Sequence, residues 1–119
     1  MVTVDELRRL ALSLPETKEE PHFEKISFRV NKKIFATYDL NTSRACLKLS
    51  VIDQDVFSSC DKANIYPVNN SWGTKGWTFV DMNSVNNELF EDALKTAYCE
   101  VASPNISILV RPTYIPSLF

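Results

Sequence analysis

The spacing of hydrophobic residues changes near residue 25, and the change separates a predicted helix from a predicted sheet. In the opening segment TVDELRRLALSLP, leucine and alanine recur every three or four positions, which predicts a helix that Pro15 ends. Thr3 and Glu6 have the spacing of a capping box at its start. Residues 16–21 are polar and acidic, and we expect a connecting loop there.

From Lys25 onward, apolar and polar residues alternate, which is the pattern of half-buried strands. Three strands are predicted, over residues 25–30, 34–40 and 45–50. Turns of three and four residues join them, and they oppose Phe28 to Ala36 and Tyr38 to Leu47. Both turns keep the apolar residues on one face, which a slip of one residue would destroy. The pattern therefore predicts a three-stranded antiparallel meander.

The second half of the chain predicts further elements around a long loop. We expect a short helix over residues 53–60 with Asp53 as its N-cap, a loop over 63–76, a strand over 77–81 and a helix over 86–102. The fold class is then α+β: an antiparallel sheet packed against N- and C-terminal helices in one domain, residues 1–102. Residues 103–119 form an apolar tail, which we expect to pack on the domain or on a partner.

Composition is that of a soluble globular protein. The 119 residues are 45% hydrophobic and 24% charged, with a net charge of −2, and no apolar run is long enough to cross a membrane. Cys46, Cys60 and Cys99 are widely spaced and form no CxxC motif. We expect them to be buried free thiols in a reducing cytoplasm. The protein partner is unknown, and a monomer or weak homodimer is expected.

The residues for catalysis or metal binding are sparse. His22 is the single histidine, and no cysteine pair accompanies it, so a zinc site is not expected. The sequence contains no GxSxG, GxxxxGK[ST] or GxGxxG motif. We therefore expect a protein that is not an enzyme and that needs no cofactor.

Basic residues are concentrated in the predicted meander. Residues 25–50 contain one acidic residue, Asp39, and six basic ones: Lys25, Arg29, Lys32, Lys33, Arg44 and Lys48. The first 24 residues contain three basic and six acidic residues. The predicted register places Arg29 beside Phe35 on the outer face of the sheet. Such a face could follow a phosphate backbone, or it could be the ordinary solvated face of a one-sided sheet.

Two tryptophans flank the glycines of the predicted long loop. Trp72 and Trp77 could stack on bases or line a ligand groove with His22. The alternation with Phe79 favours a core position for Trp77, whereas the sequence does not decide between core and surface for Trp72.

Several segments resemble the MmcQ/YjbR family of small bacterial proteins. They are PHFEKISFRVNKKIFATYD, LKLS, YPVNNSWGTKGWTFVDM and LKTAYCEVA, and together they span about residues 7–102. The resemblance implies a frataxin-like (CyaY-like) α+β fold. It also implies DNA binding by a double wing, formed here by the hairpins around residues 31–33 and 41–44.

The leading hypothesis is a cytoplasmic, non-enzymatic module that binds DNA phosphates through the six basic residues of the meander. The alternative is a protein-interaction or small-ligand module that uses the His22, Trp72 and Trp77 region or the apolar tail. A third hypothesis, iron handling through surface carboxylates, follows from the frataxin-like fold alone.

Overall fold

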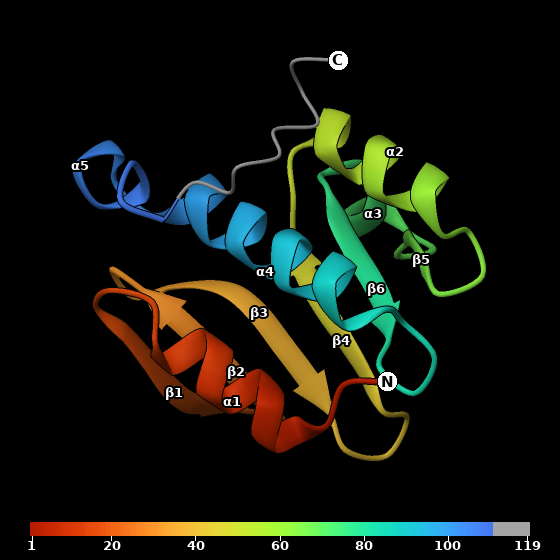
Figure 1. Ribbon diagram of the computed structural model, residues 1–119, viewed down its shortest axis with the longest axis horizontal. Helices are drawn as coiled ribbons and strands as arrows, with labels where there is room; N and C mark the ends of the chain where they lie inside the picture. Colours follow the sequence, from red (N-terminus) through yellow and green to blue (C-terminus); the bar gives the residue numbers. More distant parts are fainter. Residues whose placement is uncertain (111–119) are drawn as a thin grey trace.

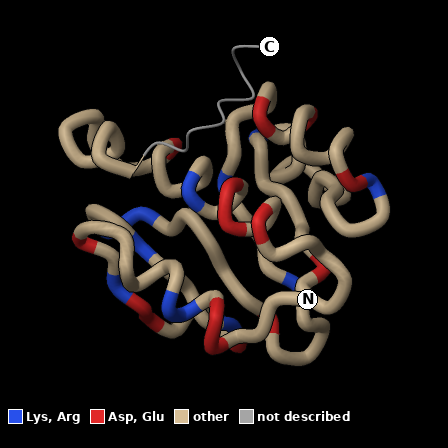
Figure 2. Tube along the Cα trace, in the orientation of Figure 1, with Lys and Arg blue, Asp and Glu red and all other residues tan. Residues whose placement is uncertain are grey.

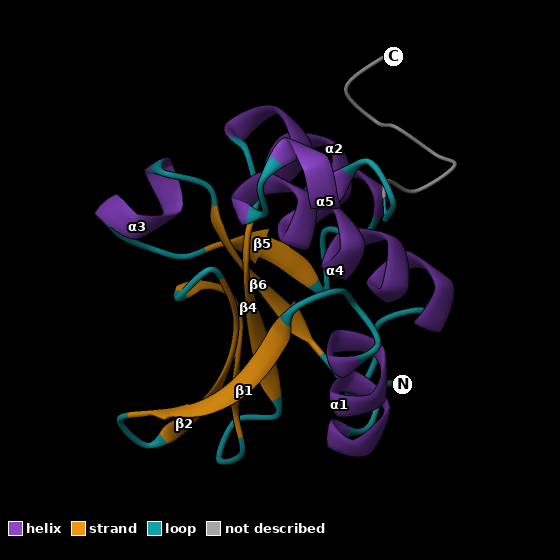
Figure 3. Cartoon of the chain, turned by 90° about the vertical axis from the view of Figure 1, so that its left-hand side faces the viewer, coloured by secondary structure: helices purple, strands orange, loops and turns teal. Residues whose placement is uncertain are grey.

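A computed structural model describes residues 1–110 of the chain, and one antiparallel sheet organises it (Figure 1). The elements in chain order are α1 (Val4–Leu12), β1 (Thr17–His22), β2 (Lys25–Val30), β3 (Lys33–Asp39), β4 (Arg44–Lys48), α2 (Val51–Cys60), β5 (Ile65–Pro67), α3 (Ser71–Thr74), β6 (Trp77–Asp81), α4 (Asn87–Val101) and α5 (Pro104–Ser107). The six strands lie in the order β1-β2-β3-β4-β6-β5. Helices α1, α2 and α4 lie on one side of this sheet (Figure 3). The α+β architecture with terminal helices on an antiparallel sheet is therefore confirmed.

The core lies between the sheet and α4. Cross-strand pairing aligns Tyr38, Ala45, Val80 and Ile65 across four strands, and all four are buried. The apolar stripe of α4 covers this surface with Phe90, Ala93, Leu94, Ala97 and Tyr98, all buried. The helix starts where expected because the Asn86 side chain accepts a hydrogen bond from the Leu89 N–H.

Three local expectations about the elements are wrong. The stretch expected to be a loop over residues 16–21 is strand β1, which lies at one edge of the sheet. The loop over 63–76 contains β5 and the short helix α3. Helix α2 begins at Val51 rather than after Asp53, because Ser50 is its N-cap and accepts the Asp53 N–H. The expected capping box of Thr3 and Glu6 is present at α1.

A β-bulge in β3 changes the predicted register of the first hairpin. Phe28 does pair with Ala36, but Val30 pairs with Lys33 across a two-residue turn, Asn31-Lys32, whose φ angles are 52° and 66°. The extra residue in β3 is Phe35, and the bulge turns it toward the helices. Phe35 is fully buried, with its ring 5.4 Å from that of Tyr98. The expected position of Phe35 beside Arg29 on the outer face is therefore wrong.

The second hairpin is displaced from its predicted register by two residues. Tyr38 pairs with Ala45 rather than with Leu47, so the four-residue turn covers residues 40–43 and begins one residue earlier than expected. Leu40, expected on the buried face, lies in that turn and is exposed. A displacement of two residues preserves the faces, because side chains alternate with a period of two.

The C-terminal tail is described as far as Val110. Ile106 and Val110 pack against the core, whereas Ile108 and Leu109 are exposed. The remainder of the expected tail, residues 111–119, lies outside the described residues.

No disulfide joins the three cysteines, but the expectation that all three are buried is wrong. Cys60 is exposed, and Cys46 and Cys99 are half-buried.

Candidate nucleic-acid interface

The face of the sheet that α1, α2 and α4 leave uncovered carries the candidate site (Figure 3). Its central row crosses five strands in register, as Ser27, Thr37, Cys46, Phe79 and Tyr66. Because Thr78 and Val80 point to the core, their neighbours Trp77 and Phe79 point to this uncovered face. Both rings are half-buried. The expectation that Trp77 is a core residue is therefore wrong.

The six basic residues predicted to contact phosphates do not form one patch. Lys25 and Arg44 lie at one end of the sheet, where Arg44 pairs with Asp39 and Asp81 across the strands. At the other end lie the β2–β3 turn with Lys32 and Lys33, the last residue of β4, Lys48, and the first residue of β6, Trp77. Basic and acidic positions intermingle over α1, β1 and β2 (Figure 2).

Both arginines among the six basic residues are held by side-chain contacts within the protein. The Arg29 Nε lies 3.3 Å from a Glu20 carboxylate oxygen and donates to the Ser27 hydroxyl at 3.0 Å. The Arg44 guanidinium lies 4.0 Å from the centre of the Phe79 ring and donates to the Tyr66 hydroxyl at 3.4 Å. These arginines are therefore poor candidates for free phosphate contacts.

The lysines are less constrained. Lys25, Lys32 and Lys33 are exposed, and their side chains form no hydrogen bond or ion pair with any of residues 1–110. Lys33 pairs with buried Val30, so it lies at the hairpin tip on the helix-covered side. Lys48 forms no ion pair within that range, but its ammonium donates to the carbonyls of Leu49 at 3.1 Å and Lys75 at 2.9 Å.

The loop that contains α3 brings two tryptophans and two lysines together. Trp77 pairs with Lys48 across the strands, and Lys48 in turn binds the Lys75 carbonyl. The Lys75 ammonium lies 5.1 Å from the centre of the Trp72 ring. We call Trp72, Lys75, Trp77 and Lys48, together with Lys32 and Lys33 of the β2–β3 turn at the same end, the tryptophan end of the sheet.

The backbone of this loop is held tightly. A side chain at Gly73 would collide with the Val68 carbonyl, and one at Gly76, whose φ is 105°, would collide with the Leu49 carbonyl. Glycine is therefore required at both positions. Buried Gln54 of α2 reaches the loop, and its amide nitrogen lies 3.0 Å from the Gly73 carbonyl and 3.1 Å from the Trp77 carbonyl.

The structure does not bring His22, Trp72 and Trp77 together, so the prediction that they line one ligand groove is wrong. His22 ends edge strand β1 and pairs with Lys25, whereas Trp77 begins β6, which is four strand positions away. At about 4.8 Å per strand, that separation is on the order of 19 Å. The two residues also lie at opposite ends of the sheet.

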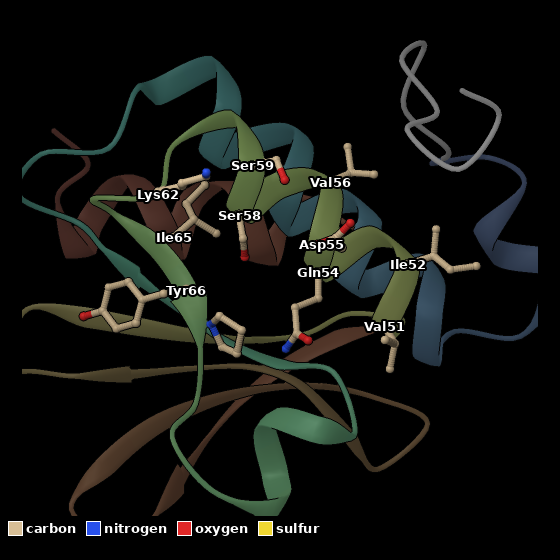
Figure 4. A pocket seen from close by; sticks show the side chains of 11 residues that line it. Val51, Ile52, Gln54, Asp55, Val56, Ser58, Ser59, Lys62, Ile65 and Tyr66 are labelled. Atoms are coloured by element: carbon tan, nitrogen blue, oxygen red, sulfur yellow. The ribbon is translucent and has the colours of Figure 1, made fainter.

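A cleft does occur elsewhere, between α2 and β5 (Figure 4). Its volume is about 770 Å³, and Val51, Ile52, Ser58, Ile65 and Tyr66 are among its lining residues. Ser58 projects from α2 into this space, and its hydroxyl has no hydrogen-bond partner in the described part of the chain. The cleft has the size of a small-molecule pocket, but it contains none of the residues proposed for the groove.

Nucleophilic and metal chemistry find little support in the described residues. Burial raises the pKa of Cys46 from its ordinary value of 9.0 to about 11, so this residue stays a neutral thiol near pH 7. Within residues 1–110, no three histidine, cysteine or acidic side chains gather into a group that could hold a metal ion. Over the same range, no helix is long and apolar enough to span a membrane.

Comparison with known proteins places this geometry in a family. The model of the YjbR family matches residues 12–100. The crystal structure of Deinococcus radiodurans protein DR2400, which carries a DUF419 domain, is similar with a TM-score of 0.76. That similarity has 23% sequence identity and covers 97% of this chain and 93% of DR2400, so it shows a shared fold. No curated protein matches the chain.

Proposed function

The chain belongs to the YjbR family, and we propose that it binds nucleic acid through the tryptophan end of the sheet. The protein acts as a binding module, and its lysines contact phosphates without reading the base sequence. The observation that carries this proposal is the grouping of lysine and tryptophan residues at one end of the sheet.

The charge at this end favours a polyanion despite the net charge of −2. Lys32, Lys33, Lys48 and Lys75 form no ion pair with a carboxylate of residues 1–110. The ion pairs at Arg8, Arg29 and Lys95 show that other basic side chains are already neutralised locally. An uncompensated lysine gains most from a phosphate, because binding releases the counterions condensed on the nucleic acid.

The proposal differs from a symmetrical double wing. Only the β2–β3 turn, with Lys32 and Lys33, lies at the tryptophan end. The β3–β4 turn lies at the other end of the sheet, where Asp39 and Asp81 flank Arg44. We therefore expect the first hairpin to contribute to binding and the second to contribute little.

The test is fluorescence anisotropy with labelled single- and double-stranded DNA through a salt series. Log affinity should fall linearly with log salt, with a slope of about 0.7 per contacted phosphate for a single strand and about 0.9 for a duplex. The double variant Lys32→Glu/Lys33→Glu should bind at least about tenfold more weakly at low salt and show a shallower slope. Lys48 is left intact because its ammonium also donates to the Lys75 carbonyl and so helps to hold the α3 loop.

A matched control is Lys25→Glu/Lys62→Glu. It changes the net charge by the same amount, and both lysines are exposed and outside the tryptophan end. Its affinity should stay close to that of the wild type. Equal losses in the two double variants would show that net charge alone drives the binding, and no binding at low salt would overturn the proposed function.

A further inference from the structure

We infer that the tryptophan end stacks on unpaired bases, so that its ligand is single-stranded nucleic acid rather than a duplex. This inference rests on the proposed function and specifies its substrate class. Trp72 provides the stacking surface.

Trp72 is unusually open for a large aromatic residue, with 56% of its surface exposed. The Lys75 ammonium lies over its ring at 5.1 Å, and no other cation or aromatic ring contacts that indole among residues 1–110. More than half of the residue is accessible to solvent and therefore to a planar ligand. The lysine beside it adds a positive charge within reach of a phosphate attached to the same nucleotide.

The ring is presented from a backbone that is already ordered. The Asn70 side chain accepts the Trp72 N–H at 2.8 Å and so caps α3. On the far side of the loop, the Gln54 amide binds the carbonyls of Gly73 and Trp77. Binding a base therefore requires little ordering of the loop, which lowers the entropic cost of association.

The geometry of the ligand decides between single and double strands. In a duplex, each base is stacked on its neighbours, and a protein ring reaches a base face only by unstacking or flipping it. In a single strand the bases can splay outward and stack on aromatic side chains, irrespective of sequence. An exposed tryptophan on the α3 loop, at an end of the sheet whose lysines form no ion pair with residues 1–110, therefore matches a flexible strand better than a rigid duplex.

The experiment compares three probes of known chemistry against the full chain. They are a thymidine 12-mer, a 12-mer of abasic residues with the same phosphates, and a 12-base-pair duplex. We expect the thymidine strand to bind about tenfold or more tighter than the abasic strand and to quench tryptophan fluorescence. Trp72→Ala should lose about tenfold in affinity for the thymidine strand and leave the abasic strand unchanged, whereas Trp72→Phe should retain most of the affinity.

Phe23→Ala is the matched control, because Phe23 is an aromatic residue that is 94% exposed but lies in the β1–β2 turn beside His22 and Lys25. It should leave the binding of all three probes unchanged. Equal affinity for the thymidine and abasic strands, or an unaffected Trp72→Ala variant, would overturn the stacking inference and leave phosphate binding intact. A failure of all three probes to bind would instead overturn the proposed function together with this inference.

Discussion

Replacement of Gln54 by leucine tests whether a buried amide holds the tryptophan loop in place. The Gln54 amide nitrogen has two N–H groups and lies within 3.1 Å of three acceptors, the carbonyls of Gly73 and Trp77 and the hydroxyl of Thr78. Leucine has a similar volume, so the change removes hydrogen bonds without opening a large cavity.

The size of the loss in stability depends on the hydrogen bonds that the acceptors still receive in the variant. The Gly73 carbonyl still accepts the Gly76 N–H at 3.0 Å, and the Trp77 carbonyl still accepts the Val68 N–H at 3.0 Å. The loss is therefore that of two net hydrogen bonds, about 1–3 kcal/mol in the free energy of unfolding, rather than that of fully orphaned acceptors. For a domain of this length, the melting temperature changes by about 4 °C per kcal/mol, so a fall of roughly 4–12 °C is expected.

The assay is thermal unfolding followed by circular dichroism, with Ser59→Ala as the control on the exposed side of the same helix. That control should melt within about 2 °C of the wild type. The Trp72→Ala variant should also melt normally, because its exposed ring contributes to binding rather than to the core. A Gln54→Leu variant that melts like the wild type would refute the view that this amide fixes the loop.

Two further changes probe the backbone of the site and the titration of its central thiol. Gly76→Ala should lower the free energy of unfolding by at least about 2 kcal/mol, because φ is 105° and the new methyl group meets the Leu49 carbonyl; an unchanged urea midpoint would contradict this. The pKa of Cys46 is raised by burial from 9.0 to about 11 in the folded protein, so its contribution to stability is complete below pH 9 and is lost as the pH rises through 11. Between pH 8 and pH 11, the free energy of unfolding in urea should therefore fall by about 2–3 kcal/mol more for the wild type than for Cys46→Ala. Equal falls in the two proteins would exclude the raised pKa of Cys46.

The sequence predicts the elements whose hydrophobic pattern is strong and local. Strands β2 to β4 follow from alternation, and α4 follows from its apolar stripe and the Asn86 cap. Strand β1 has no such signal, because TKEEPH places Glu19 on the helix-covered side. That carboxylate is compatible with the helix side because Arg8 of α1 pairs with it at 2.9 Å, a contact between elements that no local pattern reveals.

The candidate site was predictable in its residue types but not in its arrangement. Trp72, Trp77 and the lysines are visible in the sequence, yet their grouping depends on the pairing of β4 with β6, which are separated by α2, β5 and α3. The sequence of the strand that contains Trp77 does not indicate which of its two faces is buried. Thr78 and Val80 are as compatible with burial as Trp77 and Phe79. In the structure Thr78 and Val80 are buried, and the Thr78 hydroxyl accepts a hydrogen bond from the Gln54 amide.

The two edge strands also govern how the protein behaves at high concentration. An open sheet with an uncovered face risks strand-to-strand polymerisation at its edges, where unpaired backbone groups can recruit another chain. Here β5 has only three residues and ends in Pro67, while β1 contains Pro21 and exposed charges at Lys18 and Glu20. Proline removes a backbone donor, and charges disfavour a neighbouring strand. The molecule can therefore expose the aromatic and basic residues of its uncovered sheet face while its edges disfavour fibre formation.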